Sequence, residues 1–269
     1  MTTHVETVAS SIDEIAAQID AAQRTGEPIE QFGEALSLDA AYQVQARLLR
    51  LRQQRGEQLT GAKLGFTSEA KMAQMGVDEI IVGFLTDEMH LRSGESLQLT
   101  GFVHPRVEPE VAFRLSRDVA PGTTARELVA SVDAIAPALE VIDSRYRDFR
   151  FSLSDVVADN TSAACYVLGD WKRFRRDIDG LAVSLFADGR IVETGSTSDI
   201  LGHPVRALER LAGMLTTARY SLPAGSVVLA GAATAAVAAS TASRITALIA
   251  ELGQVELCIQ GNEAEGAAE

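Results

Sequence analysis

Three carboxylates in two strand-like segments are the residues best suited to chemistry. Glu108 and Glu110 lie in the run 107–111, and Glu140 lies among the apolar residues of 138–142. Side chains alternate along a strand, so Glu108 and Glu110 point to one face. A third carboxylate from a nearby strand would complete a triangle of anions. Two such charges about 4 Å apart repel by roughly 4 kcal/mol at an effective dielectric constant near 20.

Burial also disfavours the charged form of a carboxyl group. A cation, an arginine or raised pKa values of the glutamates must therefore relieve the repulsion. Oxygen-only ligands suit a hard divalent ion, either Mg²⁺ or Mn²⁺. The alternative is a pair of exposed glutamates on an edge strand, with Pro109 marking the edge. The spacing therefore indicates a metal site and leaves the edge strand open.

Lys63 stands between Gly61 and Gly65 in a short strand-like run. Glycines let a ligand or another backbone approach closely. A lysine in such a place could meet an anion, or transfer a proton if its pKa is lowered. The other interpretation is a surface lysine at the start of a strand.

Two polar segments follow the predicted strands. The run 159–162 (Asp-Asn-Thr-Ser) either caps a helix or presents N–H and hydroxyl groups to a carboxylate. Arg145 either pairs bidentately with a substrate carboxylate or forms a structural ion pair with Asp143 or Asp148. The linear sequence leaves both pairs of interpretations open.

Other catalytic motifs are missing from the sequence. The four histidines (His4, His90, His104 and His203) share no metal-ligand spacing, and no Ser-His-Asp arrangement can be argued. No Walker loop and no Gly-x-Gly-x-x-Gly after a strand is found, which argues against nucleotide binding.

Composition narrows the class of protein. The chain has 269 residues, 46% of them hydrophobic, and a formal net charge of −13. This is typical of a globular protein and argues against a nucleic-acid partner, which needs a basic face. We expect no signal peptide and no membrane span, and Cys165 and Cys258 suit reduced core positions in a cytoplasmic protein, although one disulfide stays possible.

The predicted elements divide the chain into three parts. Apolar residues at helical spacing predict two helices in an N-terminal helical segment, residues 1–58, the second capped by Ser37. A mixed, mostly β body follows over residues 59–260, with further helices at 69–75, 124–132 and 205–215. Asp188-Gly189 predicts a hairpin turn. We expect a disordered tail over residues 261–269. The predicted strands are 61–66, 81–85, 106–115, 136–143, 164–168, 181–187, 190–194, 226–230 and 244–259.

A set of short motifs gives the sequence a family resemblance. In this order they resemble the 2-keto-4-pentenoate hydratase and 4-oxalocrotonate decarboxylase group of the fumarylacetoacetate hydrolase superfamily, over about residues 35–257. Each motif is weak alone, and the set is specific. The motifs are Gly61-Ala-Lys-Leu-Gly65 with Thr67-Ser68, 71–77, 83–87, 104–110, 137–146, 157–160, 201–204 and 231–237.

The resemblance implies an α+β fold, a mixed β-roll of the fumarylacetoacetate hydrolase type with flanking helices and one divalent ion. It places the metal ligands on Glu108, Glu110 and Glu140 and makes Lys63 and Asp87 active-site residues. It also implies that groups near Thr67, Ser68 and Ser162 hold the carboxylates of the substrate, a small 2-oxo acid. Arg145 is another candidate for this contact.

The implied activity is a carbon–carbon lyase of aromatic meta-cleavage catabolism. The ion would act as a Lewis acid while 2-oxohex-3-enedioate loses its distal carboxylate to give 2-hydroxypenta-2,4-dienoate. The motifs resemble the decarboxylases more than the hydratases, which add water to that dienol. Two rivals remain: hydrolysis of a carbon–carbon bond, and a non-catalytic partner subunit. The resemblance further implies a homo-oligomer, alone or with a partner hydratase.

The substrate is the least determined feature. Phe66 stands where leucine is commoner in the group, and 240–243 replaces a Pro-Gly-Asp turn. A decarboxylase should hold the leaving carboxylate without a tight ion pair, which would stabilise the substrate itself. We therefore expect a partly apolar wall away from the glutamates, with these candidates: Phe66, Met72, Met75, Leu85 and Val237.

Overall fold

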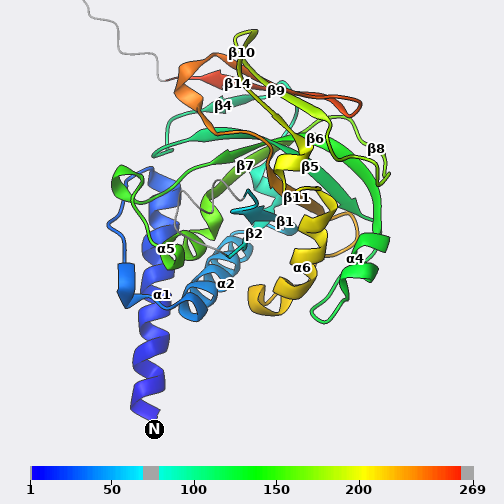
Figure 1. Ribbon diagram of the computed structural model, residues 1–269. Helices are drawn as coiled ribbons and strands as arrows, with labels where there is room; N and C mark the ends of the chain where they lie inside the picture. Colours follow the sequence, from blue (N-terminus) through cyan, green and yellow to red (C-terminus); the bar gives the residue numbers. More distant parts are fainter. Residues whose placement is uncertain (1, 69–78, 262–269) are drawn as a thin grey trace, which may run out of the picture.

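The computed structural model describes the chain over residues 2–68 and 79–261 (Figure 1). The expected helix at 69–75 and nearly all of the expected tail lie outside these residues. Two layers of sheet occupy one side of the molecule, and the helices gather on the other. Within the described ranges, no helix is long and apolar enough to cross a membrane.

The three helices that apolar spacing predicts are present in the structure. Ser37 caps the second helix by accepting a hydrogen bond from the N–H of Ala40, and Thr124 forms a capping box with Glu127. A short helix, α5, had no sequence prediction. The helices are α1 (Thr2–Thr25), α2 (Leu38–Gln54), α4 (Ala125–Ala130), α5 (Leu153–Ala158) and α6 (Val205–Ala218).

The larger sheet holds nine strands in the described residues. Its main order is β2-β1-β11-β5-β6-β7-β3, with β12 beside β5 and β8 beside β6. All pairs are antiparallel except β1 with β11 and β3 with β7. The strands are β1 (Leu59–Gly65), β2 (Ile81–Thr86), β3 (His90–Leu91), β5 (Arg106–Leu115), β6 (Val132–Ile142), β7 (Ala163–Leu168), β8 (Lys172–Arg173), β11 (Val227–Ala232) and β12 (Val237–Ala238).

The second sheet has five strands, in the order β10-β9-β13-β14-β4. The predicted turn at Asp188-Gly189 joins β9 to β10, and both residues have positive φ. The run 244–259, predicted as one strand, is a hairpin that turns at residues 250–252. The strands are β4 (Ser96–Gln98), β9 (Ala182–Ala187), β10 (Arg190–Ser196), β13 (Arg244–Ile249) and β14 (Gly253–Gln260).

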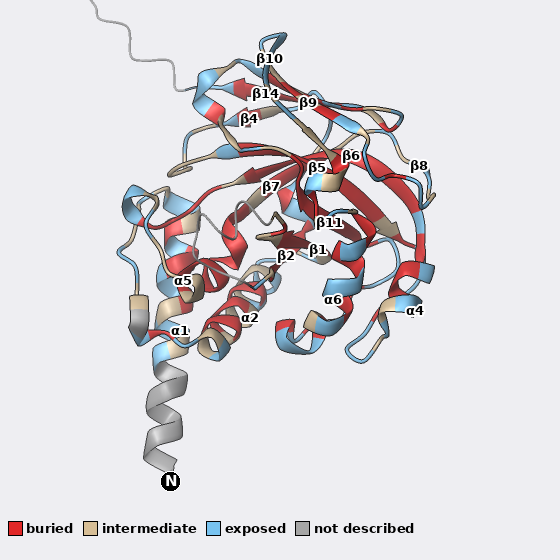
Figure 2. Ribbon diagram, in the orientation of Figure 1, coloured by how far each residue is buried: buried red, intermediate tan, exposed pale blue. Residues whose placement is uncertain are grey.

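Two apolar layers hold this arrangement together. Leu139 and Val141 of β6 pack against Ala247 and Leu257 of the second sheet, which joins the two sheets. Phe113 of β5 and Ile135 of β6 belong to a second cluster that includes the helices, through side chains such as Leu48. Figure 2 shows the buried residues along the strands and on the inner sides of the helices. The expected α+β architecture of mixed sheets with flanking helices is confirmed.

Candidate metal centre

Strand pairing brings the three predicted carboxylates together. Glu108 on β5 lies directly opposite Glu140 on β6, and Glu110 is two residues further along β5. Alternation puts Glu108 and Glu110 on one face of the sheet. One carboxylate oxygen from each of the three residues lies within 4.8 Å of those of the others. We call Glu108, Glu110 and Glu140 the glutamate group.

The glutamate group is buried and incompletely hydrogen-bonded. The exposed fraction is 8% for Glu108, 0% for Glu110 and 1% for Glu140. Glu110 accepts a hydrogen bond from the N–H of Gly231 at 2.7 Å through Oε2. Its Oε1, and Oε2 of Glu140, have no hydrogen-bond partner among the residues that the structure describes. Buried carboxylate oxygens normally have such partners. The unmatched oxygens are therefore a place where a ligand is needed.

Burial raises the pKa of Glu110 well above its ordinary value, and repulsion from Glu140 adds to the effect. Burial also raises the pKa of Glu140, and the positive charge of Lys63 opposes the shift. The Nζ of Lys63 lies 3.0 Å from Oε1 of Glu140 and donates to the carbonyl of Thr161 at 2.9 Å. Lys63 is 3% exposed, so the surface interpretation of this lysine does not hold.

A bulge in β11 shapes the backbone that contacts Glu110. The pairing of β11 with β5 shifts between Leu229 and Ala232, around Gly231. Gly231 has a φ of +106°, and a Cβ there would lie 1.8 Å from Oγ1 of Thr67. Only glycine suits this position, because any side chain would be strained and would clash. Thr67 thus packs behind the backbone that holds Glu110.

A left-handed turn at residues 160–162 holds the other side of Lys63. Asn160, Thr161 and Ser162 all have positive φ, and the amide of Asn160 both donates to and accepts from the backbone of Phe84. The turn lies so close to β1 and β2 that a Cβ on Gly65 or Gly83 would contact it at 2.6 or 2.7 Å. These contacts explain why a glycine, Gly65, follows Lys63 in β1: a larger residue would clash with the turn.

A cavity of about 310 Å³ opens beside the glutamate group. Lys63, Glu108, Thr161 and Ser162 form its polar end. Arg106 also lines the cavity. Most of the remaining wall consists of apolar side chains: Phe66, Ile81, Ile142, Phe149, Phe151, Val156, Ala235 and Ala236. Phe66, Phe149, Thr161 and Ser162 have positive φ. Such strained backbone persists only where the surroundings hold it, as they often do at ligand sites.

The remaining predicted site residues differ in their positions. Ser162 lines the cavity, and Thr67 is buried next to Gly231. Ser68 is half-buried and does not line the cavity. Asp87 is exposed, and its Oδ1 accepts a hydrogen bond from the N–H of Gln58. Lys63 pairs with Gly83, four residues before Asp87, which is about 13 Å along the strand. The structure does not bring Asp87 to the glutamate group.

Arg145 has a structural environment. It is 3% exposed, its NH1 group lies 3.3 Å from Oδ1 of Asp159, and its NH2 group donates to the carbonyl of Ala163 at 2.9 Å. Its side chain does not line the cavity. The structural ion pair was one of the two interpretations from the sequence, and the structure favours it: the predicted partner Asp143 lies 4.0 Å from Nε of Arg145, and Asp159 is a nearer partner that the sequence did not indicate.

Asp159 belongs to a second set of buried carboxylates. We call Asp143, Asp155 and Asp159 the aspartate group. Asp155 accepts hydrogen bonds from the N–H groups of Phe32 and Ser152 at 2.9 and 2.8 Å, and Asp143 accepts from Val103 at 3.1 Å. Burial raises the pKa of Asp159 to about 6, with Arg145 opposing the shift. These carboxylates tie separate segments together, and each of their oxygens accepts a hydrogen bond.

The apolar wall was predicted only in part. Phe66 lines the cavity, whereas Leu85 is buried in another cluster and Val237 packs between the sheets. Met72 and Met75 lie outside the described residues. The sequence did not identify Arg106 or Phe149. Arg106 could have been found, because it alternates with Glu108 and Glu110 along one strand. Several of the other wall residues lie outside helices and strands, where the sequence bears no periodic signal: Phe151, Ala235 and Ala236.

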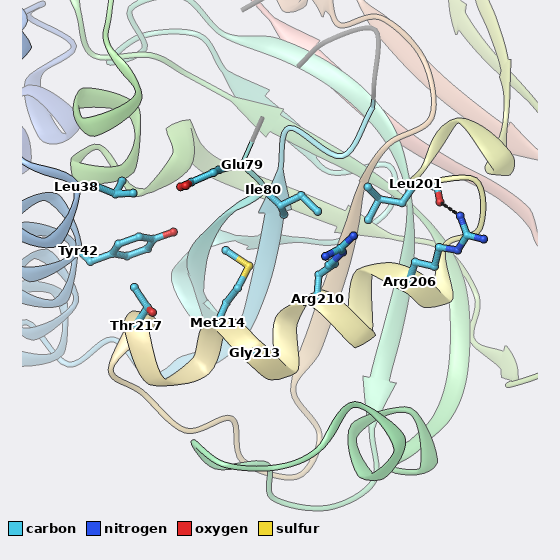
Figure 3. A pocket seen from close by; sticks show the side chains of 10 residues that line it. All are labelled: Leu38, Tyr42, Glu79, Ile80, Leu201, Arg206, Arg210, Gly213, Met214 and Thr217. Atoms are coloured by element: carbon cyan, nitrogen blue, oxygen red, sulfur yellow. Dashed lines mark hydrogen bonds between the residues drawn. The ribbon is translucent and has the colours of Figure 1, made fainter. Parts of the chain in front are cut away.

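A larger cavity of about 630 Å³ lies between α2 and α6 (Figure 3). Tyr42 and Met214 face each other across it, with Arg210 beside Ile80. Its lining includes Glu79 as its only carboxylate among the residues the structure describes. The smaller cavity is therefore the better chemical site, although it has half the volume.

The glutamate group fits a hard divalent ion. Its ligands are all carboxylate oxygens, which Mg²⁺ and Mn²⁺ prefer, and two buried oxygens lack other partners. The adjoining cavity leaves room for water or substrate to complete the coordination. Lys63 offsets the charge of Glu140, with which it forms an ion pair.

Known proteins resemble this chain over nearly its whole length. A family model described as fumarylacetoacetate (FAA) hydrolase C-terminal matches residues 60–260. A 4-oxalocrotonate decarboxylase from a Pseudomonas species is 42% identical over 252 residues, covering 93% of this chain and 98% of the relative. A 2-keto-4-pentenoate hydratase from Burkholderia vietnamiensis is 36% identical, covering 91% and 96%.

A solved structure has the same fold. The 4-oxalocrotonate decarboxylase from Pseudomonas putida G7, complexed with magnesium and adipate, superposes with a TM-score of 0.86. It is 32% identical, and the match covers 94% of this chain and 98% of that one. That relative was therefore solved with a hard divalent ion and a six-carbon diacid.

Proposed function

The chain belongs to the fumarylacetoacetate hydrolase family, and we propose that it is a divalent-metal-dependent lyase that decarboxylates 2-oxohex-3-enedioate to 2-hydroxypenta-2,4-dienoate. The observation that carries the proposal is the buried glutamate group, with unmatched oxygens, at the polar end of a mostly apolar cavity. The similarity to 4-oxalocrotonate decarboxylases selects the reaction within the family.

The reaction breaks the bond between C5 and C6 of the substrate and releases C6 as CO₂. The electron pair of that bond moves through the conjugated chain to the oxygen on C2, which gains a proton to give the dienol. A Mg²⁺ or Mn²⁺ ion at the glutamate group would supply Lewis-acid stabilisation of the negative charge on that oxygen.

Lys63 has two roles in this account. Its ammonium group pairs with Glu140, which holds that carboxylate in one orientation, and it borders the cavity where the C2 oxygen would lie. We assign Lys63 Nζ as the donor of the proton to that oxygen. The carbonyl of Thr161 accepts a hydrogen bond from Nζ and so helps to fix its position. We assign the hydroxyl of Ser162, which lines the cavity, to the substrate's C1 carboxylate.

The apolar wall limits water at the far carbons of the substrate. Phe66, Ile81 and Phe151 are side chains that cannot activate a water molecule. A hydratase would need a base beside the terminal carbon. Hydratase relatives match this chain at lower identity than the first three decarboxylase relatives do, so hydration of the dienol is the second candidate. A non-catalytic partner subunit would have no need of the glutamate group or Lys63.

The proposal extends to assembly and location. We place the enzyme in the cytoplasm, which suits its two free cysteines. We also propose a homo-oligomer, alone or with a partner hydratase. Ile191, Val192 and Leu248 of the five-stranded sheet are large exposed apolar side chains and form a candidate contact surface. Sedimentation of the pure protein, with Leu248→Glu as the variant, tests this part.

The decisive assay offers purified protein with Mg²⁺ either 2-oxohex-3-enedioate or 2-hydroxypenta-2,4-dienoate. We expect CO₂ release from the diacid, loss of that release with EDTA, and recovery with added Mg²⁺ or Mn²⁺. Rapid consumption of the dienol with no CO₂ from the diacid would replace the decarboxylase by the hydratase. Inactivity toward both would favour the non-catalytic alternative.

A further inference from the structure

We propose that Arg106, held against the ring of Phe149, is the subsite for the second carboxylate of a diacid substrate. The site would select dicarboxylates over monocarboxylates at the mouth of the cavity. The identity of the diacid rests on the proposed function, whereas the preference for two carboxylates can be measured without turnover.

The position of Arg106 matches the length of such a substrate. Arg106, Glu108 and Glu110 alternate along β5, so their side chains leave the same face. A two-residue step in a strand is about 7 Å. A six-carbon diacid has five carbon–carbon bonds of about 1.5 Å, and its end carbons are about 6 Å apart when the chain is extended. A diacid with one end at Glu108 therefore reaches Arg106.

An aromatic support holds the guanidinium group. Its carbon lies 5.1 Å from the centre of the Phe149 ring, and this ring packs against Phe151 and His104 at centroid distances of 5.5 and 5.8 Å. Asp148 and Phe149 both have positive φ, which is uncommon for a bulky residue. A guanidinium stacked on a ring keeps the N–H groups at its edge available for a carboxylate.

Over residues 2–68 and 79–261, no ion pair joins Arg106 to a carboxylate. Its side chain is exposed, so water weakens its attraction for an anion. A contact of this kind captures a diacid without holding the leaving carboxylate tightly. This satisfies the expectation that the leaving group has only modest polar contacts.

The test compares a diacid with its monoacid in the protein loaded with Mg²⁺. Calorimetry should show that Arg106→Gln weakens the binding of adipate about three- to tenfold and leaves the weaker binding of hexanoate unchanged. In the turnover assay, KM for 2-oxohex-3-enedioate should rise by a similar factor, with kcat changed by less than about twofold. Added salt should reduce the difference between wild type and variant.

The chain offers a matched control on the same strand. Arg114 also stacks on an aromatic ring, 5.4 Å from the centre of Trp171, but does not line the cavity. Arg114→Gln makes the same change of charge and should leave the binding of both acids unchanged. Arg106→Lys keeps the charge and should recover most of the adipate binding.

Equal weakening of adipate and hexanoate in Arg106→Gln would overturn the proposal, because Arg106 would then only support the cavity wall. Unchanged adipate binding would also overturn it. If the wild type releases no CO₂ but Arg106→Gln still loses adipate selectively, the proposed function fails and the diacid subsite stands.

Discussion

Two groups of buried carboxylates meet at the turn formed by residues 160–162, and their oxygen atoms have different partners. In the aspartate group, Asp155 and Asp143 accept backbone N–H groups, and Asp159 pairs with Arg145. In the glutamate group, Glu110 and Glu140 each keep an oxygen with no hydrogen bond to the described part of the chain. Burial is equally deep in both groups. The unmatched oxygens, rather than burial, separate a ligand site from a structural network.

The same contrast holds between the two cavities. The larger one, between α2 and α6, has a single carboxylate, Glu79, among its described lining residues. The smaller one adjoins the glutamate group and Lys63. Volume therefore does not locate the chemistry, whereas the pattern of charged groups with unmet hydrogen-bonding capacity does.

The largest effect should follow Glu110→Gln. Removing one ligand charge should abolish measurable Mn²⁺ binding and lower kcat/KM by on the order of a thousandfold, because Lewis-acid stabilisation is worth several kcal/mol. Glu79→Gln makes the same carboxylate-to-amide change in the larger cavity and should keep wild-type activity. Metal-dependent activity of Glu110→Gln within tenfold of wild type would remove Glu110 from the metal site.

The same substitution should make the metal-free protein more stable. The folded state raises the pKa of Glu110, so folding binds a proton there more tightly than the unfolded chain does. The free energy of unfolding therefore decreases as pH rises above about 4.3, the pKa of a glutamate in the unfolded chain. At neutral pH the wild-type protein is already destabilised in this way. Glu110→Gln removes it, and urea unfolding at pH 7.5 should show a gain on the order of 1 to 3 kcal/mol. A lower stability would mean that the carboxylate is structurally satisfied.

Lys63→Met should have the next largest effect. We expect kcat to fall about a hundredfold, since a proton donor at the cavity is lost. Stability should also fall, because the substitution breaks the buried ion pair with Glu140. The metal-free variant should lose about 3 kcal/mol, and added Mg²⁺ should restore part of it, because the ion offsets the same carboxylate. Wild-type turnover would refute the assignment of Lys63.

Asp155→Ala should show the opposite pattern. Asp155 joins the start of α5 to residues 32–33, so its loss should lower the free energy of unfolding by about 2 to 3 kcal/mol. Metal affinity and kcat, measured well below the melting temperature, should stay within twofold of wild type. Asp39→Ala, an exposed control, should change stability by less than about 0.5 kcal/mol. Loss of metal binding in Asp155→Ala would contradict the assignment of the aspartate group to structure and of the glutamate group to metal binding.

The smallest effect concerns Asp159 and pH. Burial raises its pKa to about 6, so the folded state favours the protonated form. Stability from this group is present below its unfolded pKa of about 3.9 and is lost as pH rises through about 6. Relative to Asp159→Asn, the wild type should lose on the order of 1 to 2 kcal/mol between pH 4 and pH 7. A difference that does not vary with pH would show that Arg145 fully offsets the burial of Asp159.

Local patterns were enough to predict much of this molecule. Alternation along 107–111 put Glu108 and Glu110 on one face, and apolar spacing located α1, α2 and α6. The glycines around Lys63 indicated a close approach, and the structure identifies the approaching groups as the backbone of Val227 and the side chain of Thr161. These features depend on a few neighbouring residues, so the sequence carries them directly.

Other features depend on contacts between distant segments. Nothing near Arg145 in the sequence shows that Asp159 faces it, and nothing near Asp87 shows that its strand carries it away from Lys63. The left-handed turn at Asn160 is stabilised by the backbone of Phe84, far along the chain. Tertiary contacts decide these positions, and family resemblance alone assigned Asp87 to the site.

Binding of Mn²⁺ tests the central claim most directly, because it asks whether the unmatched oxygens of the glutamate group hold an ion. Electron paramagnetic resonance at pH 7.5 would count the bound Mn²⁺ per chain. The measurement is made with and without pyruvate, a small 2-oxo acid that stands in for the substrate. We predict one ion in the wild type and in Asp155→Ala, and none in Glu110→Gln or Glu140→Gln. Equal binding by the wild type and both glutamate variants, or no binding by the wild type in either condition, would contradict the account.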